Sequence, residues 1–168
     1  MKAMILAAGR GERMGNITQN CPKPLLRVKG RCLIDWHLIK LCDAGVKDVV
    51  INVAYLSKEI IEFVGDGSKW GLNIFISEEE QALETAGGIK QAIKYLGDES
   101  FAVINADIFS DYNYKNLKNR SLENKRMGHL VLVNNPEHNL KGDFGIMDDG
   151  ILTMNSERPF TFSGIAIY

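Results

Sequence analysis

The chain has 168 residues, of which 45% are hydrophobic, so it is long enough to bury the core of one domain. Its 20 basic and 21 acidic residues give a net charge of -1, without the basic surplus typical of a nucleic-acid-binding protein. Three cysteines, at positions 21, 32 and 42, are too few and too scattered for a disulfide framework or a zinc site. No run approaches the ~20 apolar residues of a membrane span, and the first residues lack a signal-peptide pattern. We therefore expect a soluble cytoplasmic protein with no nucleic-acid or membrane partner.

Hydrophobic patterning predicts alternating strands and helices along the first two-thirds of the chain. Short continuous apolar runs, typical of strands buried on both faces of a parallel sheet, occur at residues 3–8, 49–53, 72–76 and 101–105. Apolar residues at helical spacing lie between them, at residues 33–44, 58–64 and 85–96. Ser57 is the expected N-cap of the second of these helices. This alternation predicts repeated βαβ units and a doubly wound, mainly parallel α/β sheet.

The pattern changes in the last third of the chain. A weak helix is predicted over residues 112–118, and further strands at residues 129–133, 145–147, 151–154 and 161–168. Strands that follow one another without long helices predict antiparallel additions to the sheet towards the C-terminus. The last of these strands has no helix after it. We therefore expect a single domain over residues 1–168 that lacks a C-terminal segment.

A glycine-rich loop, AAGRGERM at residues 7–14, follows the first predicted strand. Ligands of open parallel sheets lie beyond the carboxyl ends of the strands, and glycines let backbone N–H groups approach a phosphate closely. The loop is not a P-loop, because no glycine precedes Lys-Ser or Lys-Thr. Nor is it a dinucleotide fingerprint, because Met14 stands in place of the third glycine. Arg13 and Lys23 would instead bring cations to the phosphates. For the glycines alone, a tight turn without a ligand is the alternative.

LAAGRGERM followed by PKPLL resembles the signature of the sugar-1-phosphate nucleotidylyltransferases, L-A-x-G-x-G-x-R-[LM] and then P-K-[PA]. Three further matches follow in order: LETAGG at 83–88, NAD at 105–107 and GDFG at 142–145. The resemblance covers essentially the whole chain and implies a Rossmann-like nucleotidyltransferase fold. It is greatest to members that use N-acetylmuramic acid 1-phosphate in cell-wall (peptidoglycan) recycling, which share the GERM loop and the segment INVAYL at 51–56.

The resemblance implies an enzyme that transfers a nucleoside monophosphate, here UMP, from a nucleoside triphosphate to a sugar 1-phosphate and releases pyrophosphate. The attacking phosphate oxygen is already ionised, so catalysis consists mainly of positioning and charge neutralisation. UTP and N-acetylmuramic acid 1-phosphate are the implied substrates and Mg²⁺ the implied cofactor. The expected oligomeric state is a monomer or a homodimer.

The resemblance also assigns the phosphate-binding residues. The backbone at Ala8, Gly9 and Gly11 would hold the nucleotide. Arg13 would grip the leaving pyrophosphate. Lys23 would bridge the α-phosphate and the incoming sugar phosphate, and the two flanking prolines make it unlike an ordinary surface lysine.

Metal, base and sugar contacts are assigned in the same way. Asp107 would bind Mg²⁺; capping the next segment is the alternative. Thr85, Gly87 and Gly88 open a helix whose N-terminus would face the nucleotide, although capping alone explains Thr85 equally well. The sugar-binding residues implied by the resemblance are Asn105, Gly145 and Glu157.

The sequence departs from the family pattern at two places. The loop continues after Met14 as GNIT, where most members have R-P-L-T, so a second arginine and a proline are missing. The second metal-binding aspartate of the family belongs to a later segment that this sequence does not contain. The missing segment leaves one alternative open, a truncated, non-catalytic nucleotide-binding domain. A second alternative is a guanylyltransferase for mannose 1-phosphate or a heptose 1-phosphate, because those family members have similar loops.

Overall fold

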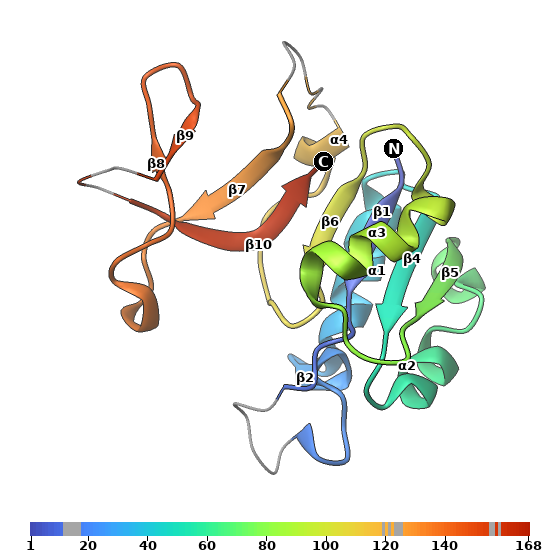
Figure 1. Cartoon of the computed structure of the whole chain (residues 1–168). Helices are drawn as coiled ribbons and strands as arrows, with labels where there is room; N and C mark the ends of the chain where they lie inside the picture. Colours follow the sequence, from blue (N-terminus) through green and yellow to red (C-terminus); the bar gives the residue numbers. More distant parts are fainter. Residues whose placement is uncertain (12–17, 119, 121, 123–125, 155–156, 158) are drawn as a thin grey trace.

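The computed structural model describes residues 1–11, 18–118, 120, 122, 126–154, 157 and 159–168 (Figure 1). Within this part of the chain the main element is a six-stranded sheet. From one edge to the other its strands are β5 (Asn73–Glu78), β4 (Asp48–Val53), β1 (Ala3–Leu6), β6 (Ala102–Asn105), β10 (Thr161–Ile167) and β7 (His129–Val133). The first four strands are parallel, β10 is antiparallel to β6, and β7 is antiparallel to β10. The mainly parallel sheet with antiparallel additions from the C-terminal third is thus confirmed.

Helices cover both faces of the sheet because successive strand residues point to opposite sides. Ala3 and Ile5 of β1 belong to a core formed with α1 (Leu33–Asp43), α2 (Ser57–Val64) and α4 (Lys115–Lys118). Met4, between them, belongs to a second core against α3 (Glu84–Leu96). The central strands are therefore apolar on both faces along most of their length, which explains the continuous runs in the sequence. The doubly wound arrangement is confirmed.

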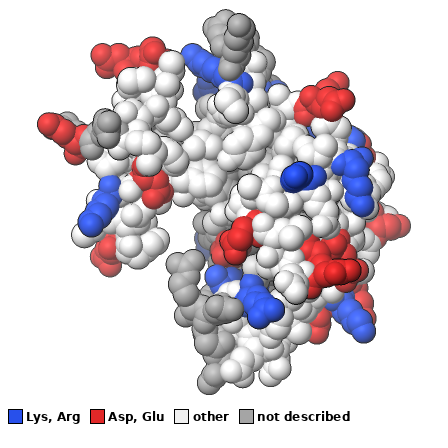
Figure 2. All heavy atoms as spheres, viewed as in Figure 1, with Lys and Arg blue, Asp and Glu red and all other residues white. Residues whose placement is uncertain are grey.

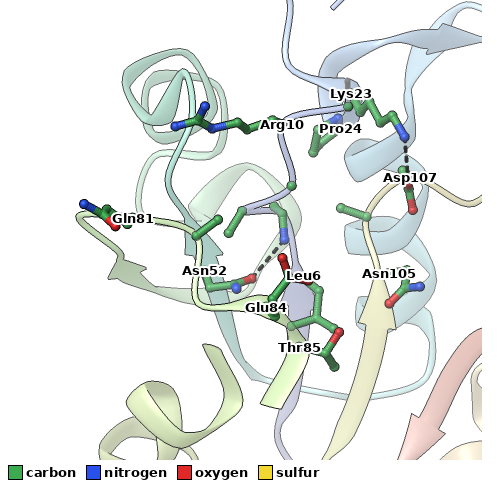
Figure 3. Close-up of a pocket in the computed structure, with 16 residues that line it drawn as sticks. Leu6, Arg10, Lys23, Pro24, Asn52, Gln81, Glu84, Thr85, Asn105 and Asp107 are labelled. Carbon is green, nitrogen blue, oxygen red and sulfur yellow. Dashed lines mark hydrogen bonds and ion pairs between the residues drawn. The ribbon is translucent and has the colours of Figure 1, made fainter. Parts of the chain in front are cut away.

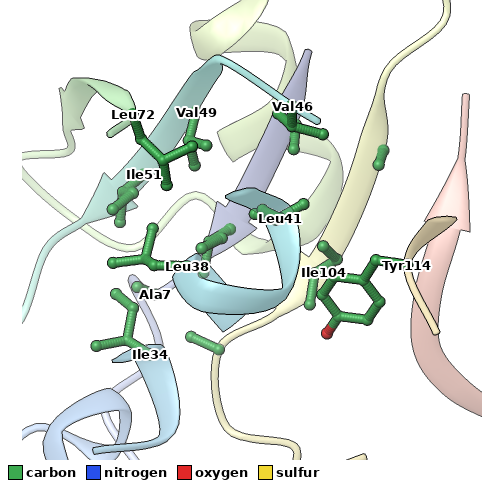
Figure 4. Close-up of a cluster of buried hydrophobic side chains, with 14 of the residues drawn as sticks. Ala7, Ile34, Leu38, Leu41, Val46, Val49, Ile51, Leu72, Ile104 and Tyr114 are labelled. Atoms are coloured by element: carbon green, nitrogen blue, oxygen red, sulfur yellow. The ribbon is translucent and has the colours of Figure 1, made fainter. Parts of the chain in front are cut away.

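Helix α1 contributes three buried side chains to the first core. Its buried side chains Ile34, Leu38 and Leu41 lie over the apolar residues of β4 and β6 (Figure 4). Burying one such side chain contributes about 1.5–3 kcal/mol. Gly45, at φ 74°, follows the helix in the left-handed conformation that commonly ends helices.

The expected N-cap of α2 is wrong. Leu56 occupies the cap position in the left-handed conformation, at φ 50°, and Ser57 is the first helical residue. The Ser57 hydroxyl donates instead to Glu78 Oε1 at 2.9 Å. The serine therefore ties the start of α2 to the end of β5 instead of capping the helix.

Short elements complete the fold. They are η2 (Lys23–Leu25), the hairpin β2 (Arg27–Val28) and β3 (Arg31–Cys32), η3 (Ser68–Trp70), η4 (Glu137–Asn139), and the hairpin β8 (Gly145–Ile146) and β9 (Leu152–Thr153). We call β8 and β9, with the adjoining ends of β7 and β10, the arm; it projects from the body of the molecule at the left of Figure 1. Figure 2 shows a hollow between the arm and the body, and acidic and basic side chains interspersed on that face. Among the described residues, no helix combines the length and the hydropathy needed to cross a bilayer.

The strand order places a crevice at the carboxyl ends of β1 and β6. The chain passes from β1 to β4 and β5 on one side of β1, then returns to form β6 on its other side. In open α/β sheets, ligands bind where the strand order reverses in this way.

Candidate active site

A cavity of about 830 Å³ lies at this point of the sheet. Its walls come from the loop after β1, the segment around η2, the loop before α3 and the end of β6 (Figure 3). Sites for small ligands commonly measure about 300–1,000 Å³. The cavity is therefore large enough for a nucleotide.

Two glycines leave the first wall of this cavity without side chains. A Cβ on Gly9 would have no neighbour within 4 Å, so the backbone there faces open space. Gly11 has φ 70°, and a Cβ on it would lie 2.9 Å from two carbons of the Lys23 side chain. The missing side chain at Gly11 thus lets Lys23 pass close to the loop. Ala8, Gly9 and Gly11 all line the cavity.

Lys23 and Asp107 meet at the edge of the cavity. Lys23 begins η2 between two prolines that fix φ, and Pro24 is buried. Asp107 follows β6, where the chain leaves the sheet. The Lys23 Nζ lies 3.2 Å from Asp107 Oδ2, and the two side chains are 17% and 44% exposed (Figure 3). A cation assigned to the phosphates and a carboxylate assigned to Mg²⁺ are thus brought together across the fold.

Buried polar contacts hold the segment that follows Asp107. His37 Nδ1 on α1 lies 2.7 Å from the Tyr114 hydroxyl. Burial lowers the pKa of His37 to about 4, so the ring is neutral at neutral pH and shares a hydrogen bond with the Tyr114 hydroxyl. Lys40 donates to the backbone carbonyl oxygen of Ser110, and burial lowers its pKa too. Helix α1 thereby fixes the position of the Asp107 loop.

The loop before α3 and the first residues of α3 form another wall. Glu84 and Thr85 line the cavity (Figure 3). Gly87 and Gly88 do not; a Cβ on Gly87 would lie 2.7 Å from the Leu83 Cβ, and Gly88 is buried behind the cavity. Because these two residues have no side chain, the first turn of α3 can pack closely on its neighbours.

The other predicted residues lie at three different places. Asn105, at the end of β6, lines the cavity and packs against Gly164 of β10, where a Cβ would lie 2.8 Å from Asn105 Nδ2. Gly145 is buried in β8 and Glu157 is exposed, and neither lines the cavity. Arg13 lies outside the described residues.

Sequence reasoning missed two buried polar residues next to the cavity. Asn52 in β4 and Glu79 after β5 are each 3% exposed and are hydrogen-bonded to each other. The available signal was the single polar residue in the otherwise apolar run VVINV. Arg10 and Gln81 line the cavity and were also missed.

The described residues hold no group of three or more His, Cys, Asp or Glu side chains placed to bind a metal. Asp107, the predicted Mg²⁺ ligand, lines the cavity.

Comparison with known proteins decides the family. The sequence profile of the nucleotidyl transferases matches residues 2–159. The chain belongs to the nucleotidyl transferase family. The resemblance found in the motifs is therefore confirmed, and with it the enzymatic character of the family.

Two curated nucleotidyl transferases illustrate the range of similarity. N-acetylmuramate alpha-1-phosphate uridylyltransferase from Neisseria meningitidis serogroup B is 47% identical over 173 residues, which cover 100% of this chain and 75% of that protein. Mannose-1-phosphate guanyltransferase from Hypocrea jecorina is 37% identical over 120 residues, 70% of this chain and 33% of that protein.

A solved structure supports the fold. HddC from Yersinia pseudotuberculosis, complexed with GMP-PN, superposes with a TM-score of 0.80 at 26% identity, over 99% of this chain and 75% of that one. The predicted nucleotidyltransferase fold is confirmed.

Proposed function

We propose that this nucleotidyl transferase transfers UMP from UTP to N-acetylmuramic acid 1-phosphate and releases pyrophosphate. The observation that carries the proposal is the meeting of Lys23 and Asp107 beside a glycine loop that lines a nucleotide-sized cavity. The 47% identity to the Neisseria uridylyltransferase, over the full chain, favours these two substrates over others in the family.

The reaction is an in-line displacement at the α-phosphorus. A phosphate oxygen of the sugar 1-phosphate forms the new bond to this phosphorus, and the bond from it to the oxygen bridging to the β-phosphate breaks. Pyrophosphate leaves with that oxygen and the electron pair. The nucleophile carries no proton to remove, so the protein must align two polyanions and offset their repulsion.

The residues of the cavity can meet this need. The backbone N–H groups at Ala8, Gly9 and Gly11 would bind the triphosphate, since glycine leaves them accessible. Lys23 would lie between the α-phosphate and the sugar phosphate and stabilise the charge that accumulates there. We assign the pyrophosphate contact to Arg13.

Mg²⁺ fits the side chains present. Asp107 offers the hard carboxylate oxygen that Mg²⁺ prefers, and Mg²⁺ is commonly held by one or two carboxylates together with substrate phosphates and waters. Asp107 would hold the ion, which when bound neutralises phosphate charge. Lys23, now paired with Asp107, would then be available to the phosphates.

Specificity would arise at both ends of the cavity. Thr85 and the N-terminus of α3, which Gly87 and Gly88 help to position, would face the nucleotide. Asn105 would contact the sugar, with Gly145 and Glu157 contributing from the side of the arm. The use of a nucleoside triphosphate favours a cytoplasmic location.

A guanylyltransferase acting on mannose 1-phosphate is the second candidate. It is favoured by the identity to the Hypocrea protein and by the likeness to a structure complexed with GMP-PN. A non-catalytic nucleotide-binding domain is less well supported, because a binder needs no carboxylate beside its phosphate-binding lysine.

Pyrophosphate release in Mg²⁺ buffer tests these proposals. Each of UTP, GTP, CTP and dTTP is paired with the 1-phosphates of N-acetylmuramic acid, mannose and glucose. We expect release only with UTP and the muramic sugar. Release with GTP and mannose 1-phosphate would replace our proposal by the second candidate. Nucleotide binding without release in any pair would support the non-catalytic domain.

A further inference from the structure

A buried amide and a buried carboxylate lie directly behind the cavity. Asn52 is the second-last residue of β4, and Glu79 immediately follows β5. The side-chain nitrogen Nδ2 of Asn52 donates to Glu79 Oε1 at 2.8 Å. Each residue is 3% exposed, so the bond is shielded from water.

The two outer atoms of this pair reach two different loops. Asn52 Oδ1 accepts the N–H of Ala7, the first residue of the glycine-rich loop, at 2.9 Å (Figure 3). Glu79 Oε2 accepts the N–H of Leu83, just before α3, at 2.8 Å. A continuous chain of hydrogen bonds thus runs from the phosphate side of the cavity to the start of α3.

The loop before α3 depends on such support. Glu84, which follows this loop as the first residue of α3, has φ 59°, which residues other than glycine rarely adopt. A Cβ on Gly88 would lie 2.7 Å from Asn52 Nδ2 and 2.8 Å from Glu79 Oε1, so the first turn of α3 packs directly on the pair. The pair therefore determines where this turn and its loop lie.

A buried charge at this position is costly without full hydrogen bonding. Among the described residues, no lysine or arginine forms an ion pair with Glu79; its partners are the amide of Asn52 and the N–H of Leu83. A neutral glutamine would face donors on both sides with only one acceptor oxygen. The carboxylate is thus matched to two donors from two loops.

We propose that Asn52 and Glu79 are positioning residues that fix the glycine-rich loop relative to the start of α3, and so set the affinity for the nucleoside triphosphate. They act through Ala7 and Leu83, not on the reacting atoms. This inference rests on the proposed function, in which these two walls hold the phosphates and the nucleoside of one ligand.

A reciprocal exchange tests the pair. In Glu79→Gln the new amide nitrogen meets either Asn52 Nδ2 or the N–H of Leu83, so two donors face each other. In Asn52→Asp two carboxylates face each other. In the double variant Asn52→Asp/Glu79→Gln, the aspartate accepts from Ala7 and from the glutamine amide, and the glutamine oxygen accepts from Leu83. All three hydrogen bonds are restored, and the negative charge has moved from position 79 to position 52.

We expect each single variant to weaken the binding of UTP with Mg²⁺, measured by calorimetry, about tenfold, because one buried hydrogen bond is replaced by a mismatch. The double variant should return to within about twofold of the parent. The KM for UTP should rise in the single variants, while kcat and the KM for the sugar 1-phosphate stay close to those of the parent. Gln91→Ala is the matched control. It removes a 2.7 Å bond from α3 to the Glu78 carbonyl but does not reach the glycine-rich loop, so it should lower the melting temperature without changing UTP affinity.

Hydrogen exchange without ligand separates this inference from the proposed function. Glu79→Gln should speed amide exchange both in residues 7–11 and in residues 83–86, and the double variant should reverse this. Unchanged exchange in residues 7–11 would overturn the linkage whatever the nucleotide. Altered exchange with unchanged UTP affinity would overturn its role in binding. A parent chain that binds none of the four nucleotides would overturn the proposed function, and this inference with it.

Discussion

The Nζ of Lys23 lies 3.2 Å from Oδ2 of Asp107, although the two residues are 84 positions apart in the chain. Both side chains are partly exposed, and ion pairs of this kind contribute about 0–1 kcal/mol to stability. The pair therefore adds little to the stability of the fold. Its cation and its carboxylate are both accessible to a phosphate-bearing ligand. Its replacement should affect activity far more than stability.

Lys23→Ala should lower kcat by about 10²–10³-fold, the usual loss when one group that stabilises transition-state charge is removed. The melting temperature should change little, and Lys23→Arg should keep part of the rate because it keeps the charge. Steady-state pyrophosphate release and thermal unfolding measure both. Lys58→Ala, on the exposed side of α2, is the matched control for loss of a lysine. A Lys23→Ala enzyme with the kcat of the parent would remove this residue from the mechanism.

Asp107→Asn keeps the shape of the side chain but removes the charge that would hold Mg²⁺. The Mg²⁺ concentration that gives half-maximal rate should rise about tenfold or more, because a carboxylate is a much better ligand for this ion than an amide. Asp111→Asn, in the exposed segment four residues on, should behave like the parent. An unchanged Mg²⁺ titration for Asp107→Asn would show that the ion binds elsewhere.

Gly9→Ala should separate nucleotide binding from stability. A Cβ there meets no atom within 4 Å, and φ lies outside the left-handed region, so unfolding should match the parent. The same Cβ would stand between the backbone N–H groups and the phosphates, so calorimetry should show weaker UTP binding. Retained UTP affinity would place the phosphates away from this loop.

Gly11→Ala should behave differently from the neighbouring glycine. Its φ of 70° costs an alanine about 1–2 kcal/mol, and the new Cβ would press on the Lys23 side chain from 2.9 Å. We expect a lower free energy of unfolding in urea and a lower kcat together. An equally stable Gly11→Ala protein would contradict this reading of the loop.

The free energy of unfolding should fall as the pH drops below 6.5, the ordinary pKa of histidine. Burial lowers the pKa of His37 to about 4, from 6.5, so the unfolded chain binds a proton there before the folded chain does. This contribution is complete above pH about 6.5 and is lost as the pH falls towards about 4. Between pH 7.5 and 5 it amounts to about 2 kcal/mol.

Urea unfolding in EDTA at those two pH values measures the effect. His37→Gln keeps an acceptor for the Tyr114 hydroxyl and should lose about 2 kcal/mol less than the parent over this interval. His129 adds to the fall in both proteins, because burial lowers its pKa as well. An equal loss in parent and variant would show that His37 does not carry the pH dependence.

Much of the fold follows from local patterns. The apolar run at residues 3–8 predicts a strand buried on both faces, and the structure has β1 at Ala3–Leu6 in the centre of the sheet. Lys23 and Asp107 stand out because each follows a structural break, a proline or a strand end, where a charged side chain can point at a ligand.

What the sequence did not reveal depends on contacts between distant segments. Asn52 and Glu79 look like an ordinary strand residue and one of three consecutive glutamates; only the packing of β4 against β5 and α3 makes them partners. Serine is a residue type that commonly caps helices, but Leu56 takes the cap position in the left-handed conformation and the Ser57 hydroxyl donates to Glu78.

The most direct test of the account follows the oxygen atoms through one turnover. The chain is incubated with UTP, Mg²⁺ and N-acetylmuramic acid 1-phosphate whose phosphate oxygens carry the heavy isotope of oxygen, and both products are analysed by mass spectrometry. Attack by the sugar phosphate on the α-phosphorus predicts that all the label appears in a UDP-linked sugar and none in pyrophosphate. Label in pyrophosphate, or UTP consumed without a labelled nucleotide sugar, would contradict the proposed reaction.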